Sequence, residues 1–220
     1  MISIINISQF NEIVKGIKAM KADLVYVAGN TLYGTDNNCM TLKTYVLDTF
    51  IPVEPFTIVT KTLSSEFYNR IIDVNISIDT DINKIYCTAN KSSVDEFPEM
   101  INNSFNDRIK NIVNNLTRDI CNPMTRIIDF GEITNDEYLQ RFKSIKSAEG
   151  ADLYTPNGNS TYGMYLYTGA IPMTKSDKIS LKVYDLGNTF IAEYIIYKKK
   201  INPVSLCFRF VKLENSMYRA

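Results

Sequence analysis

The chain has 220 residues with 24 basic and 24 acidic side chains, so its formal net charge is zero. A neutral chain has no overall attraction to nucleic acid, and any contact with DNA has to come from local segregation of charge. The sequence contains no histidine, which excludes Ser-His-Asp and Cys-His nucleophile arrangements within the chain. This length suits one large domain or two domains of about 100 residues each.

The four cysteines are widely scattered: Cys39, Cys87, Cys121 and Cys207. No pair has the spacing of a metal or redox site, and without histidine a zinc centre would need all of the thiolates. We therefore expect free thiols in a reducing cytoplasm, no metal and no cofactor. The N-terminus lacks a basic region followed by an apolar run, and no apolar stretch is long enough to cross a membrane. The sequence thus predicts a cytoplasmic protein, in the host cell if it is viral.

Residues 5–10 have the pattern of a helix start. Asn6 can cap the first free backbone N–H groups, and Gln9 can reach back to the cap residue. The predicted helix runs from about residue 7 to residue 21. Its apolar side chains recur at helical spacing on one face: Phe10, Ile13, Val14 and Ile17.

The rest of the first half alternates β-rich runs with turn signals. The runs separated by Gly29-Asn30 and Asp36-Asn37-Asn38 predict an antiparallel meander. A short helix capped by Ser64 or Ser65 is expected through about Ile72. The predicted strands of this half are residues 2–5, 24–27, 31–33, 40–47, 56–60, 74–78 and 84–89. Strands that alternate apolar and polar residues, with a helix on one face, predict an α+β sheet layer.

One turn of this half allows two interpretations. Asp79-Thr80-Asp81-Ile82-Asn83 begins like a calcium-binding loop, but Lys84 stands where glycine is needed and Asn90 where the bidentate glutamate should be. A hairpin turn is the favoured interpretation. Asp95 and Glu96 could in principle serve as a hydrolytic pair, but adjacent acids in a loop are usually solvated. The sequence therefore predicts no catalytic residues and no enzymatic activity.

Residues 91–124 interrupt the pattern of strands. Pro98 and Pro123 bracket a segment with an apolar residue at every third or fourth position: Ile101, Phe105, Ile109, Ile112, Leu116 and Ile120. We predict a helical connector that packs one face onto the sheets and leaves its charged side chains in solvent. The chain then divides into a first module of residues 1–90, the connector, and a second module of residues 125–220.

The second half repeats the order of the first. Ile133-Thr134-Asn135-Asp136-Glu137-Tyr138 matches the first helix start in its cap and flanking apolar pair, and predicts a helix over residues 135–148. Both helices lead into the same tripeptide, Ala22-Asp23-Leu24 and Ala151-Asp152-Leu153. The predicted strands of this half are residues 126–130, 151–154, 162–167, 179–184, 189–197 and 204–210. We interpret the match as a duplicated module, and the alternative is coincidence between two short lysine-rich and isoleucine-rich helices.

The two helices carry basic side chains in a similar register: Lys15, Lys18 and Lys21 in the first, and Arg141, Lys143 and Lys146 in the second. One interpretation is that a helix on the outside of a sheet needs a solvated face, which lysine supplies. The other is that two equivalent helices present cations on one surface of a neutral protein. Such a surface suits a sequence-independent contact with DNA phosphates. Glu12 and Glu149 weaken the positive charge of the helices.

A neutral chain of two such modules, with basic residues on the leading helices, resembles the DNA sliding clamps. These are the polymerase processivity factors of the proliferating cell nuclear antigen type, and the similarity is greatest to the short bacteriophage clamps. The resemblance covers most of residues 2–90 and 125–213. It implies a homotrimeric ring of six modules around double-stranded DNA, with the sheets outside and the leading helices lining the hole. It also implies a hydrophobic pocket beneath the connector, where tails of the DNA polymerase and the clamp loader dock.

Two other classes of protein stay open. A phage virion or assembly component, such as a ring, neck or tail adaptor, would also be a non-enzymatic α+β oligomer. In such a protein the lysines would be incidental, and residues 91–124 would form an arm that grips neighbouring subunits. The third class is a small hydrolase or nucleotide-modifying enzyme that uses carboxylates alone.

Overall fold

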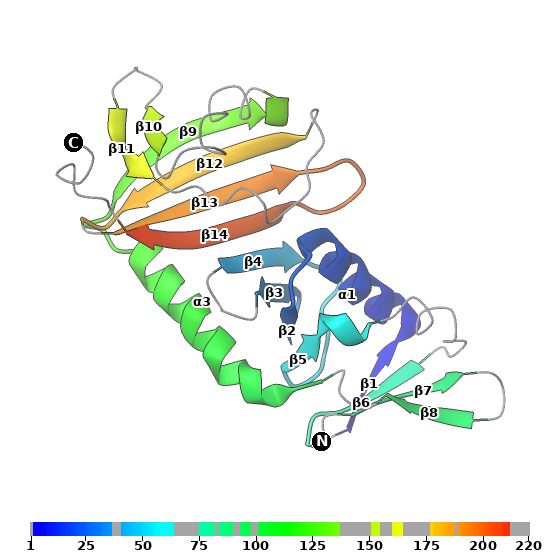
Figure 1. Ribbon diagram of the computed structural model, residues 1–220. Helices are drawn as coiled ribbons and strands as arrows, with labels where there is room; N and C mark the ends of the chain where they lie inside the picture. Colours follow the sequence, from blue (N-terminus) through cyan, green and yellow to red (C-terminus); the bar gives the residue numbers. More distant parts are fainter. Residues whose placement is uncertain are drawn as a thin grey trace. The chain divides into compact units, whose positions relative to one another are not determined.

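The computed structural model describes residues 2–36, 41–63, 75–81, 84–89, 93–97, 101–136, 151–154, 160–164, 177–187 and 189–211. The chain divides into two compact units (Figure 1). Unit 1 is Met1–Asn114 and unit 2 is Asn115–Ala220. The division of the chain at residues 90 and 124 stays a prediction.

Unit 1 contains two antiparallel sheets, in the orders β5-β2-β3-β4 and β1-β6-β7-β8. The strands of the first sheet are β2 (Leu24–Ala28), β3 (Thr31–Thr35), β4 (Thr41–Val46) and β5 (Phe56–Val59). Those of the second are β1 (Ile2–Asn6), β6 (Asn75–Asp79), β7 (Lys84–Ala89) and β8 (Ser93–Phe97). The predicted meander is confirmed, and so is the predicted hairpin between β6 and β7. A single turn of 3₁₀ helix, Thr60–Thr62, follows β5.

Strand β8 lies within the segment that the sequence predicted as a helical connector. Its residues pair with β7, from Ile85↔Phe97 to Ala89↔Ser93. Asp95 and Glu96 give this stretch the composition of a loop, and pairing with a neighbouring strand overrides that local preference. The helical part of the connector is a short turn, Asn103–Phe105, followed by α3 (Asn106–Ile120).

Helix α1 (Ile7–Met20) begins with the predicted capping box. The backbone N–H of Gln9 donates to Asn6 Oδ1 at 2.9 Å, and the backbone N–H of Asn6 donates to Gln9 Oε1 at 3.1 Å. All of its large apolar side chains except that of Ile7 are buried: Phe10, Ile13, Val14, Ile17 and Met20. A Cβ atom at Gly16 would lie 2.5 Å from Leu32 Cδ1 and 2.7 Å from Tyr45 Cδ1. Glycine at this position therefore lets α1 lie directly on β3 and β4.

The first part of α3 covers the opposite face of the same sheet. Because successive side chains of a strand point to opposite faces, Leu24 and Tyr26 of β2 point away from α1. Ile109 of α3 is fully buried against both of these side chains. The hydroxyl of Thr57 on β5 donates to Asn106 Oδ1 at 2.6 Å, which holds the start of α3 against the edge strand. Unit 1 thus contains a helix, sheet and helix in three layers.

Unit 2 contains an antiparallel sheet in the order β14-β13-β12-β9. Its strands are β9 (Arg126–Thr134), β12 (Lys178–Asp185), β13 (Thr189–Tyr197) and β14 (Val204–Val211). A separate hairpin joins β10 (Ala151–Tyr154) and β11 (Ser160–Met164). One face of the larger sheet is apolar and buried, with Leu181, Phe190 and Leu206. With the sheets and helices of unit 1, this arrangement confirms the predicted α+β class.

The second predicted helix falls mostly outside the described residues. Asn135 and Asp136 are helical, and the backbone N–H of Asn135 donates to the carbonyl of Asp177 at 2.7 Å. Strand β9 continues to Thr134, the predicted cap residue. The rest of that helix and the short helix predicted after Ser64 lie outside the described part of the chain. Neither α1 nor α3, the α-helices described in full, is long and apolar enough to cross a membrane.

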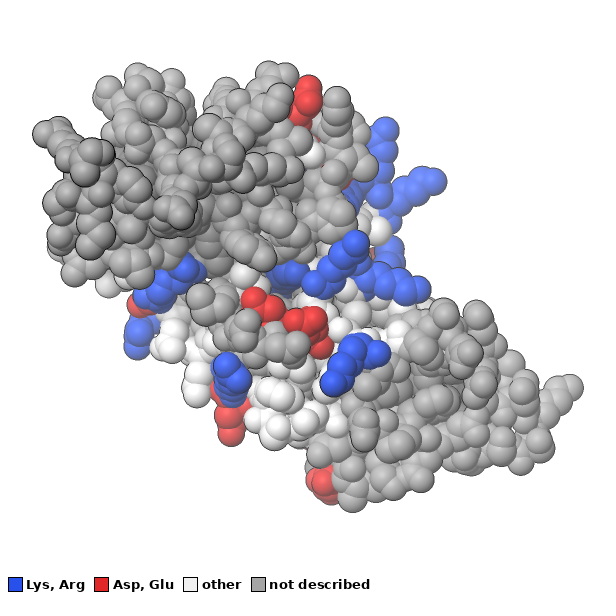
Figure 2. Space-filling model, viewed as in Figure 1, with Lys and Arg blue, Asp and Glu red and all other residues white. Residues whose placement is uncertain are grey.

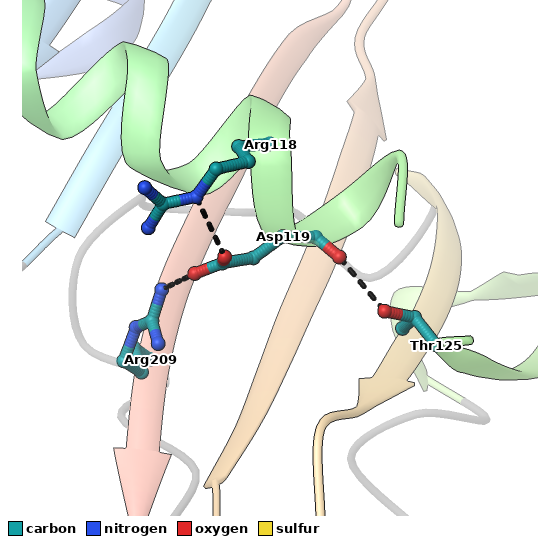
Figure 3. Close-up of polar contacts among 4 residues, drawn as sticks. All are labelled: Arg118, Asp119, Thr125 and Arg209. Carbon is teal, nitrogen blue, oxygen red and sulfur yellow. Dashed lines mark hydrogen bonds and ion pairs between the residues drawn. The ribbon is translucent and has the colours of Figure 1, made fainter. Parts of the chain in front are cut away.

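The last turn of α3 is attached to β14 within unit 2 (Figure 3). The Asp119 carboxylate accepts hydrogen bonds from Arg209 and from Nε of Arg118, the latter at 3.4 Å. The Asp119 carbonyl accepts from the Thr125 hydroxyl at 2.9 Å. The hydrogen bond from Arg209 holds the pKa of the Asp119 carboxyl below its usual value. Its side chain is 19% exposed, so this ion pair is partly shielded from solvent.

We predict that Gly16→Val lowers the free energy of unfolding by about 2 kcal/mol, because the new side chain would overlap Leu32 and Tyr45. Asn11→Val is the matched control, since Asn11 is exposed on the same helix and the change carries only the helix-propensity difference of a few tenths of a kcal/mol. Urea unfolding of both variants makes the comparison. Equal losses of stability would show that α1 does not lie close to the sheet at Gly16.

We predict that Asp119→Asn lowers stability at neutral pH by about 1 kcal/mol, because it removes a charge-assisted hydrogen bond to a partly exposed arginine. The pKa of Asp119 is lowered in the folded state, so the ionised carboxylate stabilises the fold fully above about pH 4 and loses this effect as the pH falls through its folded pKa. Urea unfolding across acidic pH should show the two proteins converging. A difference that stays constant down to the lowest pH would contradict this role of the carboxylate.

Candidate nucleic-acid interface

The face of α1 that points away from the sheet is polar. Its exposed side chains follow one line along the helix: Ser8, Asn11, Lys15 and Lys18. We call these four residues the α1 stripe. The apolar side chains of α1 are committed to the protein core, so the helix cannot rotate without exposing them. The exposure of Lys15 and Lys18 therefore follows from the burial of the opposite face.

The end of α1 is held by a buried lysine that the sequence analysis did not single out. Lys21 ends the helix in a left-handed conformation with φ 47°, and its carbonyl accepts a hydrogen bond from Lys43 Nζ at 2.8 Å. The Lys43 side chain reaches this carbonyl from β4 and is only 4% exposed as a residue. Burial lowers its pKa, while Asp23 and Asp36 favour its charged form. A cation at the negative end of the helix dipole stabilises the turn that carries Lys18 and Lys21.

The sequence contains a signal for the burial of Lys43. It lies on β4 in the same alternating phase as Tyr45, whose ring contacts α1 at Gly16. A lysine in phase with an inward-facing aromatic residue on a strand is a candidate for a buried cation. The pattern of residues 40–47 predicted only a strand.

The acid of α1 lies on the flank of the helix. Glu12 is half-buried, and its carboxylate accepts hydrogen bonds from the Thr49 hydroxyl at 2.8 Å and the Thr49 backbone N–H at 3.3 Å. The Gln9 side chain donates to the Phe50 carbonyl at 3.1 Å. The loop after β4 thus holds Glu12 to one side of the α1 stripe. On the face drawn in Figure 2, acidic side chains lie among the basic ones, so the positive areas of that face are local.

Half of the predicted DNA-facing residues can be placed. Lys15 and Lys18 share the α1 stripe, and Lys21 is exposed at the end of the same helix. Arg141, Lys143 and Lys146 lie outside the described residues, as does Glu149, and their positions stay a prediction.

Unit 2 has a hollow of about 500 Å³ beside the last turn of α3. It is lined by Asp119, Asn122, Met124, Thr125, Asp185, Leu186, Gly187, Thr189 and Arg209. Most of these side chains are polar, whereas the resemblance implies a hydrophobic pocket near this part of the chain. Among the residues that line this hollow, only Met124 and Leu186 carry large apolar side chains. This hollow therefore does not have the chemistry expected for the pocket that docks partner tails.

The described thiols are in the free form. Cys121 is exposed and Cys207 is buried, and neither forms a disulfide. Burial raises the pKa of Cys207 to about 12, so its thiol stays protonated at neutral pH. Within the described ranges, no three Cys, Asp or Glu side chains are grouped to hold a metal ion.

Comparison with known proteins gives matches only among solved structures. No protein-family model and no curated protein sequence matches the chain. The chain is similar to a putative DNA polymerase III beta subunit from Eubacterium rectale, with 10% identity and a TM-score of 0.47 over 98% of this chain and 65% of that one. It is also similar to pol III beta of Caulobacter crescentus, with 11% identity and a TM-score of 0.46 over 98% of this chain and 66% of that one.

A third similar structure is the beta clamp of Helicobacter pylori bound to a DNA ligase peptide, with 11% identity and a TM-score of 0.44. That match covers 100% of this chain and 69% of the clamp. This chain thus spans slightly less than two thirds of the length of the first two proteins. These TM-scores lie below 0.5. The fold described above is therefore defined by the strand pairings and helix contacts of this chain alone.

Proposed function

We propose that this chain is a DNA sliding clamp, a non-enzymatic processivity factor that encircles duplex DNA and tethers a replicative polymerase. The observation that carries the proposal is the α1 stripe, where Lys15 and Lys18 are exposed on a helix whose other face is buried in the sheet. Lysine is a compact charge on a flexible stem, which suits a contact with phosphates that does not depend on base sequence. The stabilised end of α1 adds Lys21 to the same helix.

The proposed assembly is a closed homotrimer whose leading helices line the central hole. In this arrangement the DNA-facing residues are Lys15, Lys18 and Lys21 from the first module and Arg141, Lys143 and Lys146 from the second. Each lysine–phosphate contact is weak and exchanges with solvent and salt, so the ring can slide. Retention on DNA then comes from encirclement, not from tight binding. The proposed partners are duplex DNA, a DNA polymerase and a clamp loader, the two proteins docking by a hydrophobic pocket.

We predict that Lys15→Glu/Lys18→Glu abolishes stimulation of the cognate polymerase on primed circular DNA and leaves the fold intact. The reversed charge would repel the DNA phosphates. The fold should stay intact because both side chains are exposed and lie off the buried face of α1. Lys61→Glu/Arg126→Glu is the matched control, because it changes the net charge equally at two exposed positions outside α1. Circular dichroism and urea unfolding verify the fold of each variant. Unchanged stimulation by the α1 variant, or equal loss with the control, would contradict the proposed DNA contact.

We also predict a solution mass of about 75 kDa, three times the 25.1 kDa of one chain. Light scattering coupled to size-exclusion chromatography measures it directly. A chain that stays monomeric at all concentrations would argue for a virion or assembly component that associates only during assembly.

A further inference from the structure

The hairpin between β13 and β14 carries three consecutive lysines, Lys198, Lys199 and Lys200. The two strands pair without interruption from Thr189↔Val211 to Ile196↔Val204. A continuous antiparallel ladder fixes the base of the hairpin, so its turn is presented from a rigid support. This turn belongs to unit 2, and no part of it was among the predicted DNA-facing residues.

The turn is exposed and positively charged. Lys199 and Lys200 are exposed, and Lys198 is half-buried. Figure 2 shows basic side chains that project at the end of this hairpin, where β13 turns into β14 in Figure 1. Basic side chains on such a support can reach a ligand without any movement of the sheet.

The exposed charge of the turn is carried by Lys199 and Lys200. Lys178 lies opposite Tyr197 in the ladder and donates to Glu132 Oε1 at 2.5 Å, so that acid is already bonded to another lysine. The exposed lysines of the turn therefore form a positive area on a protein with no net charge.

The backbone of the turn does not favour lysine. Lys200 has φ 66°, a left-handed conformation in which glycine and asparagine are usual. Three adjacent like charges also repel one another.

We propose that Lys199 and Lys200, in the turn between β13 and β14, form a second contact surface for the phosphodiester backbone of duplex DNA. This inference rests on the proposed function, because it takes DNA as the ligand. It does not depend on a DNA contact by α1. Charge and side-chain reach suffice for such a contact, so it is independent of base sequence. Two exposed lysines of this turn add to the number of phosphates that the protein neutralises.

The test is the salt dependence of duplex binding, measured by fluorescence anisotropy with a labelled duplex and the full-length protein. Each lost phosphate contact lowers the slope of log affinity against log salt by about 0.9. Lys199→Glu/Lys200→Glu should lower the slope by about 2. Lys61→Glu/Arg126→Glu changes the net charge equally at other exposed positions and should leave the slope close to that of the parent protein.

The same titration with Lys15→Glu/Lys18→Glu separates failure of this inference from failure of the proposed function. If the α1 variant lowers the slope and the turn variant matches the control, the turn is not a DNA contact and the proposed function stands. If only the turn variant lowers the slope, the turn is a contact and the role of α1 is wrong. If neither lowers it, both proposals fail.

Lys200→Gly distinguishes a structural turn from a binding turn. Glycine suits the left-handed conformation, so this variant should be at least as stable as the parent protein. If Lys200 contacts DNA, the slope of log affinity against log salt should fall by about 1, although the variant is at least as stable as the parent protein. An unchanged slope would overturn a DNA contact by Lys200.

A single strand of the same length tests the identity of the ligand. If Lys199→Glu/Lys200→Glu loses more affinity for the single strand than for the duplex, the assignment to duplex DNA is overturned.

Discussion

The close approach of α1 to the sheet of β2, β3 and β4 is the contact on which the rest of unit 1 depends. Gly16 makes it possible, since any side chain there would overlap Leu32 and Tyr45. Fully burying a Phe, Ile or Met side chain contributes about 1.5–3 kcal/mol, and α1 buries several of them on this face. Exposed surface lysines contribute far less. The orientation of α1 is therefore set by its apolar face, and the position of its lysines is a consequence.

Polar contacts then fix the helix at both ends. The capping box of Asn6 and Gln9 satisfies backbone donors at the start, and the buried ammonium of Lys43 lies at the carbonyl end. Glu12 is bonded to Thr49 on the flank. These contacts leave a surface that carries the cations of Lys15 and Lys18 and keeps the nearest acid of the helix engaged elsewhere. A cationic surface on a rigid helix suits a sequence-independent ligand with many equivalent charges, which is the chemistry of a DNA backbone.

Most of the described strands and the start of α1 could be predicted from the sequence, because they depend on local signals. The Asn6–Gln9 pair is such a signal, and so is the alternation of apolar residues along β12. Strand β8 could not be predicted, because pairing with β7 outweighs the loop-like composition around Asp95 and Glu96.

The contacts around α1 could be predicted less completely than the strands. The exposure of Lys15 and Lys18 could be predicted, because helical periodicity separates them from the apolar face. Lys43 was missed because its role depends on a carbonyl 22 positions away in the sequence, which only the packing of α1 on β4 brings within reach. The role of Gly16 was missed for the same reason, since a helix pattern does not reveal which residue faces a tyrosine ring. The turn at Lys198–Lys200 was visible in the sequence, but its exposure depends on the pairing of β13 with β14.

The most direct test of the central claim is the reactivity of individual lysines toward acetylation, measured by mass spectrometry with and without duplex DNA. The account predicts that DNA protects Lys15 and Lys18, that buried Lys43 is unreactive in both conditions, and that exposed Lys61 reacts equally in both. Equal reactivity of Lys15 and Lys18 with and without DNA, under conditions where the protein is bound, would contradict it.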